Sequence, residues 1–168
     1  MIERTFFPKS RILDGNGKLK KLFHGTRHPE IASGGLSPGK AGAQGPGIYL
    51  SDLSEGACNE YGKFTIPVYA NITNPWVFHP SDESLDAAVN GELLEQVLGS
   101  EAAQIVIDRI DKHGLEAYGS ELMQALRLRG HDGIVMVYPW SAGFLKGGNV
   151  VIAFHADQVI PALGCLSV

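Results

Sequence analysis

Cysteines and long apolar runs are both scarce in this sequence. Its 168 residues include two cysteines, Cys58 and Cys165, which are too few for a disulfide framework and too isolated for a zinc site. No stretch approaches the roughly 18 uninterrupted apolar residues of a membrane-spanning helix. The N-terminal Met-Ile-Glu-Arg also lacks the apolar core of a secretory signal. We therefore expect no membrane association and a cytoplasmic location, unless another component delivers the protein into a host or target cell.

Several common catalytic and metal-binding signatures are missing as well. The sequence has no Gly-x-x-x-x-Gly-Lys-Ser/Thr phosphate loop and no strand-linked Gly-x-Gly-x-x-Gly fingerprint. A Gly-x-Ser-x-Gly nucleophile elbow is also absent. His24 and His28 have the spacing of a metal-binding pair, but no third ligand accompanies them and the residues between them are not helical in composition. We therefore expect no metal site.

Positive charge is in short supply. The formal net charge is −4, which argues against strong nonspecific binding to nucleic acid because neutralising phosphates requires clustered cations. A local exception, called here the basic group, comprises Arg11, Lys18, Lys20, Lys21 and Arg27. We interpret the basic group first as a solvated face and second as a landing surface for a phosphate-bearing ligand.

The length and the order of predicted elements indicate one α+β domain over residues 1–168. A hydrophobic content of 44% is ample for one sizeable core in a chain of this length. Strands are predicted before and after a helical block at about 81–129, and this order favours mainly antiparallel strands over regular strand-helix alternation. The predicted strands are 20–24, 47–52, 64–72, 76–78, 134–138 and 150–154, and the helical pieces lie near 82–98, 100–113 and 115–129.

The clearest chemistry lies in residues 22–61. The first strand delivers His-Gly-Thr (residues 24–26) at its expected end, where binding groups tend to lie. Gly47-Ile48-Tyr49-Leu50-Ser51-Asp52 forms a second strand, and Tyr61 closes the helix-like segment that follows. The two tyrosines thus offer a flat slot for a planar ring bearing an amide, while the glycine beside the histidine allows close approach to its backbone.

This pattern of His-Gly-Thr, then Gly-Ile-Tyr-Leu-Ser-Asp, then a downstream Ala and Tyr resembles the ADP-ribosyltransferases of the diphtheria-toxin and poly(ADP-ribose) polymerase type. The lead-in at residues 7–18 is similar to that of ADP-ribosyltransferase-like domains in phage and mobile-element proteins. The resemblance implies two small, mainly antiparallel sheets around an NAD cleft, with an inserted helical block. It also implies a mono-ADP-ribosyltransferase, an enzyme of the glycosyltransferase class that moves ADP-ribose from NAD to a macromolecule and releases nicotinamide.

The resemblance assigns roles to individual residues. His24 would bind the adenosine-side ribose of NAD, the backbone of Gly25 would pair with the nicotinamide amide, and Tyr49 would stack on the nicotinamide ring. Tyr61 matches the second stacking tyrosine, although its separation from Tyr49 is longer by one residue than the family usually has. The alternative is that Tyr61 packs in the core of its helix. The remaining NAD contacts that the resemblance implies are Thr26 and Ser51.

The third catalytic position departs from the family pattern. Many relatives place a glutamate at the start of the last strand, where it supports the positive charge that develops on the ribose, as in glycoside hydrolysis. Here the register places Val150 at that position with Asn149 beside it, and no glutamate lies within the strand. An apolar residue there indicates single transfer rather than chain elongation, or an inactive module.

Three residues elsewhere in the chain are candidates to replace the missing glutamate. They are Glu121, Asp132 and Gln158. Each also has a structural interpretation, Glu121 as a solvated helix residue, Asp132 as part of a turn and Gln158 as a strand-end residue.

The loop from Pro139 to Gly148 precedes the third position. Trp140 and Phe144 are costly to leave in water, and our hypothesis is that they contact the acceptor, a target protein or RNA. The alternative is that they fold back onto the sheet.

Two other functions remain open. One is a catalytically inactive module that binds NAD or ADP-ribose, which the missing glutamate suggests. The other, suggested by the basic group, is an RNA-directed relative that either ADP-ribosylates nucleic acid or resembles a 2′-phosphotransferase. The oligomeric state and the role as toxin, phage effector or housekeeping enzyme also stay open.

Overall fold

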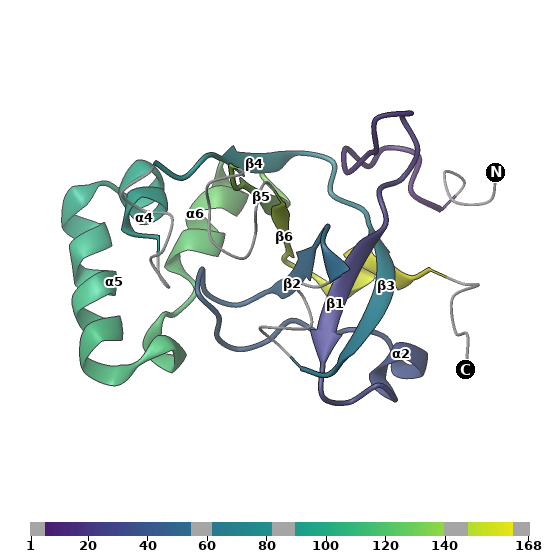
Figure 1. The fold of residues 1–168 in the computed structure, drawn as a ribbon. Coiled ribbons are helices and arrows are strands. Elements are labelled where there is room, and N and C mark those ends of the chain that lie inside the picture. The colour runs from purple at the N-terminus through teal and green to yellow at the C-terminus, as the bar shows by residue number, and fades with distance from the viewer. Residues whose placement is uncertain (1–5, 55–61, 82–89, 140–147, 163–168) are drawn as a thin grey trace.

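The structure is a computed structural model that describes residues 6–54, 62–81, 90–139 and 148–162 (Figure 1). In this part of the chain, seven strands form one sheet in the order β4-β5-β6-β2-β1-β3-β7. The strands are β1 (Leu22–Thr26), β2 (Ile48–Ser51), β3 (Phe64–Ala70), β4 (Pro75–Phe78), β5 (Gly133–Val137), β6 (Asn149–Ala153) and β7 (Val159–Pro161). The helices are α2 (Ile31–Gly34), α4 (Gly91–Leu98), α5 (Ser100–His113) and α6 (Glu121–Leu128), with 3-10 turns η2 (Leu115–Ala117) and η3 (Ala156–Gln158).

The helical block connects the one parallel pair among these strands. β4 and β5 run parallel, with Pro75 opposite Gly133 and Phe78 opposite Met136, whereas the other strand pairs are antiparallel. Parallel neighbours cannot be joined by a tight turn and need a long crossover, which α4, α5 and α6 supply at the left of Figure 1. The α+β class with an inserted helical block is therefore confirmed.

The two small sheets expected from the sequence are joined into one. β1 pairs with β3 over its whole length, but it pairs with β2 only at Phe23 opposite Ser51. β2 in turn pairs with β6 over all four of its residues. The sheet thus consists of two well-paired halves held together at a single register position, and the strands that carry His24 and Tyr49 meet at this junction.

Strand pairing also moves the boundaries of β1. The sequence predicts a strand at 20–24 with His24 at its end, whereas β1 runs from Leu22 to Thr26. The reason is the antiparallel partner, because the register from Leu22 opposite Val68 to Thr26 opposite Phe64 continues the ladder past the apolar run. His24 therefore lies in the middle of its strand.

Only the later part of the helix predicted at 82–98 lies within the described residues. Residues 82–89 are outside the described part of the chain, and α4 begins at Gly91 with Asn90 as its N-cap. The Asn90 side-chain oxygen accepts a hydrogen bond from the Leu93 amide at 3.1 Å, as expected for an asparagine cap. The two later pieces agree closely with α5 and with η2 followed by α6.

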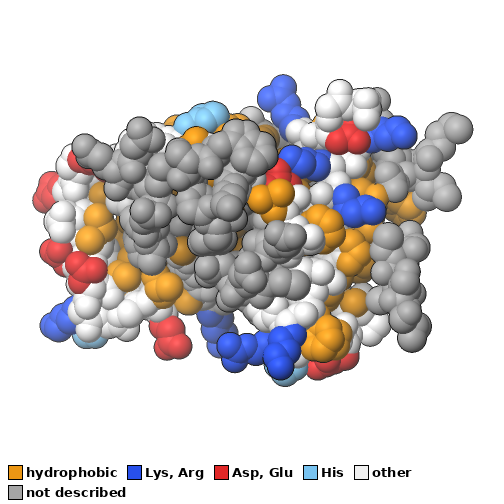
Figure 2. Space-filling view, viewed as in Figure 1, with side chains coloured by type: hydrophobic (Ala, Val, Ile, Leu, Met, Phe, Trp, Pro, Cys, Tyr) orange, Lys and Arg blue, Asp and Glu red, His pale blue; other side chains and the backbone are white. Residues whose placement is uncertain are grey.

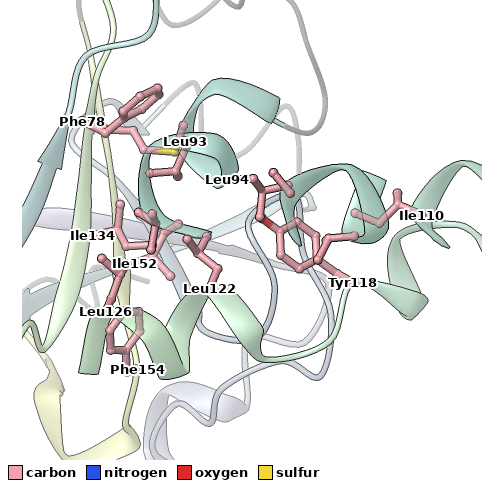
Figure 3. Close-up of a cluster of buried hydrophobic side chains, with 14 residues drawn as sticks. Phe78, Leu93, Leu94, Ile110, Tyr118, Leu122, Leu126, Ile134, Ile152 and Phe154 are labelled. Atoms are coloured by element: carbon pink, nitrogen blue, oxygen red, sulfur yellow. The ribbon is translucent and has the colours of Figure 1, made fainter. Parts of the chain in front are cut away.

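Each face of the sheet buries its own core. Alternate residues of a strand point to opposite faces, so in β6 Ile152 joins the core beneath the helices while Val151 and Ala153 join the core on the other side. Figure 3 shows Leu122 and Leu126 of α6 beside Ile134 and Ile152 of the sheet. Within the described residues, no helix combines the length and apolar character that crossing a bilayer requires.

Candidate functional site

His24 bridges the two halves of the sheet. Its Nδ1 lies 3.0 Å from the main-chain carbonyl oxygen of Tyr49, and its side chain is half-buried. Since a carbonyl oxygen only accepts hydrogen bonds, this contact requires the proton on Nδ1. In the neutral ring, Nε2 is then an unprotonated acceptor. The imidazole can thus hold the two strands together with one nitrogen and bind a hydroxyl with the other.

The hydroxyl of Tyr49 is held by the loop that precedes its strand. It donates a hydrogen bond to the Gly45 carbonyl oxygen at 2.7 Å and accepts one from the Gln44 amide at 2.9 Å. These two contacts define the direction of the phenol ring. Tyr49 is therefore suited to present a ring face to a ligand, while its hydroxyl is hydrogen-bonded to the main chain of the preceding loop.

Glycines let this loop lie against the tyrosine ring. A Cβ at Gly42 would lie 2.5 Å from Cε2, Cζ and the hydroxyl oxygen of Tyr49, closer than any side chain permits. The ends of the loop are joined by two main-chain hydrogen bonds between Gly39 and Gly47, at 2.9 and 3.2 Å. We call residues 39–47 the tyrosine clamp.

Thr26 and Ser51 are buried at the ends of β1 and β2. The hydroxyl of Thr26 accepts a hydrogen bond from the His28 amide at 3.0 Å, and that of Ser51 accepts one from the Leu53 amide at 3.0 Å. Each hydroxyl thus stabilises a turn of the main chain just after its strand. Gly25 is also buried, directly beside His24.

Val150 lies on the same face of the sheet as Tyr49. The register pairs Ser51 with Val150 and Tyr49 with Ile152, and side chains of directly opposed residues share a face. Val150 is half-buried and packs against the core beneath the helices. The position that the family pattern gives to a glutamate is thus occupied by a partly buried hydrocarbon.

A carboxylate nevertheless contacts the start of β6. The Asp52 Oδ1 accepts a hydrogen bond from the Asn149 amide at 2.6 Å, and the Asp52 amide donates to the Asn149 carbonyl at 3.1 Å. Its Oδ2 forms an ion pair with Lys20 at 2.5 Å. The Asp52 side chain is 8% exposed, so it holds β6 to the end of β2 while its charge is offset by the lysine.

Comparison with protein-family models adds the deciding observation. The model described as ADP-ribosyltransferase in polyvalent proteins matches residues 14–165. This chain belongs to that ADP-ribosyltransferase family. No curated protein matches the sequence significantly. Domains of the family use NAD as the donor of ADP-ribose.

In this member of the family, the structure brings most of the predicted site residues onto three adjacent strands. His24, Gly25 and Thr26 lie on β1, Tyr49 and Ser51 lie on β2, and Asn149 and Val150 begin β6. Three predicted residues, Tyr61, Trp140 and Phe144, lie outside the described residues. Gly62, which follows Tyr61, lies against the end of β1, because a Cβ there would be 2.3 Å from the Thr26 carbonyl oxygen.

Two of the three candidates to replace the missing glutamate hold turns of the chain. Asp132 accepts hydrogen bonds from the Thr73 amide and hydroxyl and from the Asn74 amide, each at 2.8 Å. The Gln158 side-chain oxygen accepts from the Phe154 and His155 amides at 2.9 and 2.8 Å. Both residues therefore hold turns.

Glu121 is the third candidate to replace the missing glutamate. It forms an ion pair with Arg109 at 2.8 Å, and 43% of its side chain is exposed. Glu121 is therefore a partly exposed member of an ion pair, not a fully solvated helix residue.

The basic group does not form one surface. Lys20 is paired with Asp52, and the five residues of β1 lie between Lys21 and Arg27, which places them about 20 Å apart along an extended strand. On the face shown in Figure 2, blue side chains gather in separate places at the upper right and along the lower margin.

The functional residues that sequence reasoning missed are those that hold the site together. Gly42, Gln44 and Gly45 clamp Tyr49, and Asp52 with Lys20 tethers β6. The signal for the clamp was the dense run of glycines before β2. Asp52 stood at the end of the recognised strand motif, but its partner Asn149 is 97 positions away in sequence.

Proposed function

We propose that this chain transfers a single ADP-ribose unit from NAD to a macromolecular acceptor and releases nicotinamide. The observation that carries the proposal is the contact between His24 Nδ1 and the Tyr49 carbonyl at 3.0 Å. It joins a hydroxyl-binding imidazole to an aromatic ring whose direction is held by the tyrosine clamp. That pairing suits a substrate with a ribose at one end and a planar ring at the other.

In the proposed reaction the bond between the ribose carbon and the nicotinamide nitrogen breaks. The electron pair leaves with nicotinamide, which becomes neutral, and positive charge develops on the ribose. Tyr49 would stack on the leaving ring, and His24 Nε2 would accept a hydrogen bond from a ribose hydroxyl. The acceptor nucleophile then bonds to the ribose carbon and loses its proton.

Val150 supports single transfer over chain elongation. A valine offers neither a charge for the ribose cation nor a hydrogen-bond acceptor for an incoming sugar hydroxyl. The nearby Asp52 carboxylate forms an ion pair with Lys20 and a hydrogen bond with the Asn149 amide. These contacts reduce the electrostatic stabilisation that Asp52 could give to a cationic ribose. The same observation supports the second candidate, an inactive module that binds NAD or ADP-ribose.

The test is incubation of the purified chain with a cell lysate and NAD labelled in its adenylate part. Protease-sensitive label with release of nicotinamide supports the proposal. RNase-sensitive label would favour the RNA-directed alternative instead. Binding of NAD without nicotinamide release would favour the inactive module, and absence of both binding and release would contradict every reading of this site.

We also propose that Trp140 and Phe144 contact the acceptor. Their side chains are large and apolar and lie in the sequence between β5 and β6, and aromatic anchors are common at protein interfaces. Replacing both with alanine should lower target modification more than hydrolysis of NAD. Equal losses in the two reactions would contradict this role.

A further inference from the structure

The tyrosine clamp rests on the helical block. In Figure 1 the segment between α2 and β2 extends toward the helices before it returns to the sheet. A Cβ at Gly45 would lie 3.0 Å from Tyr118 Cδ1 and 3.1 Å from the Gly119 carbonyl oxygen. Gly45 has a φ of 86°, a left-handed conformation that glycine adopts without strain. The backbone that accepts the Tyr49 hydroxyl bond thus lies directly against the link between η2 and α6.

That link is in turn held by one arginine of α5. The Arg109 Nε donates to the Ala117 carbonyl oxygen at 2.6 Å, and its Nη2 donates to the Tyr118 carbonyl oxygen at 2.6 Å. The guanidinium also pairs with Glu121, the first residue of α6, at 2.8 Å. A planar guanidinium with several donors can hold three acceptors at once.

The Tyr118 ring cannot move independently of the helices. It is 1% exposed and belongs to the core beneath them. Figure 3 shows the ring between Leu94, Leu122 and Ile110, three residues from three different helices. Rotation of the ring would therefore disturb close packing on all sides.

We propose that Arg109 and Tyr118 are positioning residues for Tyr49. Arg109 holds the link, the Tyr118 ring supports Gly45, and the Gly45 carbonyl directs the hydroxyl of Tyr49. The helical block thereby determines the affinity of the site for the ring that stacks on Tyr49. The inference rests on the proposed function in one respect, which is that the stacked ring belongs to NAD.

The physical reason is preorganisation. A ring that is already held in its binding orientation loses less freedom when a ligand stacks on it. Without the arginine, the clamp and the tyrosine would sample several orientations. We expect Arg109→Gln to weaken NAD binding by about three- to tenfold, which is the effect of losing one ordinary hydrogen bond.

Arg129→Gln is the matched control. Arg129 also uses Nη2 to donate to a helical carbonyl oxygen, that of Val97, at 2.6 Å. It therefore matches Arg109 in residue type and kind of contact, but it does not touch the link beside Gly45. Calorimetric titration with NAD should show weaker binding for Arg109→Gln and unchanged binding for Arg129→Gln.

A double-mutant cycle tests whether the effect passes through the tyrosine hydroxyl. Tyr49→Phe removes the bonds to Gly45 and Gln44 but keeps the ring. In that background, Arg109→Gln should have little further effect on NAD affinity. An undiminished effect of Arg109→Gln in the Tyr49→Phe protein, or equal effects of Arg109→Gln and Arg129→Gln, would overturn the proposal.

A ligand-free measurement separates this inference from the proposed function. The Gln44 amide donates to the Tyr49 hydroxyl, so its NMR resonance reports the clamp without NAD. The resonance should shift in Arg109→Gln and in Tyr49→Phe, but not in Arg129→Gln. If the Gln variant fails to fold, Arg109→Lys, which keeps the charge and loses the fork of donors, should give the same shift. An unmoved resonance would overturn the inference even if NAD is the substrate.

Discussion

The Nδ1 of His24 and the carbonyl oxygen of Tyr49 lie 3.0 Å apart at the junction of the two halves of the sheet. The main-chain ladder between β1 and β2 has one register pair, Phe23 opposite Ser51. A side chain thus supplements strand pairing at the place where the ligand would bind. His24 therefore has a structural role in addition to the binding role that we propose, and its variants must separate the two.

His24→Ala should lower NAD affinity by roughly tenfold or more, since it removes both the strand contact and the acceptor nitrogen. His24→Asn restores a donor near Nδ1 without the Nε2 acceptor, so it should recover stability but not binding. Calorimetric titration and urea unfolding measure the two properties. His28→Ala is the control, because its side chain is exposed and paired with Glu30. Normal NAD binding by His24→Ala would refute the site.

Gly42→Ala should impair NAD binding while the fold persists. The new methyl group would overlap the Tyr49 ring and push it from its orientation, and overpacking of this kind costs about 1–3 kcal/mol. At Gly39, by contrast, a Cβ would meet its nearest neighbours at 3.5 and 3.6 Å, which is ordinary contact. Gly39→Ala should therefore bind NAD like the natural sequence. Equal NAD affinities for the two variants would contradict the clamp.

Tyr118→Phe should make the protein more resistant to alkali. Burial, and secondarily the Glu121 carboxylate, raises the pKa of Tyr118 above its ordinary value of 10.0. The folded state thus holds the phenol proton more tightly than the unfolded state. The stability from this difference is complete below the ordinary pKa and is lost as the pH rises above it.

Urea unfolding at about pH 8 and about pH 11 tests this prediction. The natural protein should lose more free energy of unfolding between the two conditions than Tyr118→Phe. At the lower pH the substitution should cost little, because the hydroxyl has no hydrogen-bond partner among the described residues. NAD affinity should be unchanged, since phenylalanine keeps the ring beside Gly45. Identical losses in the two proteins would show that Tyr118 does not titrate in this range.

Asp52→Asn should lower the free energy of unfolding by about 1–3 kcal/mol. It removes a charged partner from Lys20 and weakens the bond to the Asn149 amide, and hydrogen bonds to charged groups are worth about that much. Asp108→Asn is the control, since Asp108 is exposed and contacts Gln104 within one helix. Urea unfolding compares the variants. Equal stabilities would mean that Asp52 does not tether β6.

Local patterns in the sequence account for the elements and for the residues of the site. The His-Gly-Thr and Gly-Ile-Tyr-Leu-Ser-Asp motifs located β1 and β2 and their candidate residues, and the helical pieces predicted near 100–113 and 115–129 located α5 and α6. These features depend on neighbours a few positions apart. The role of Asp132 as a turn residue was likewise visible in its Gly-His-Asp-Gly context.

Other features depended on pairings that the sequence does not reveal. The extension of β1 past His24 depended on the register with β3, and the union of the two sheets depended on one pair of residues. The acidic neighbour of β6 could not be foreseen, because Asp52 and Asn149 meet only when β2 and β6 align.

The sequence by itself determined which side chains are candidates to bind NAD, because the motifs that contain His24, Gly25 and Tyr49 are local. Only the tertiary structure decided how those side chains are held. The support of Tyr49 by Gly45, and of Gly45 by Tyr118, joins segments whose contact depends on packing the helices against the sheet. Such contacts have no local period or spacing, because they arise from close packing between elements that are distant in the chain.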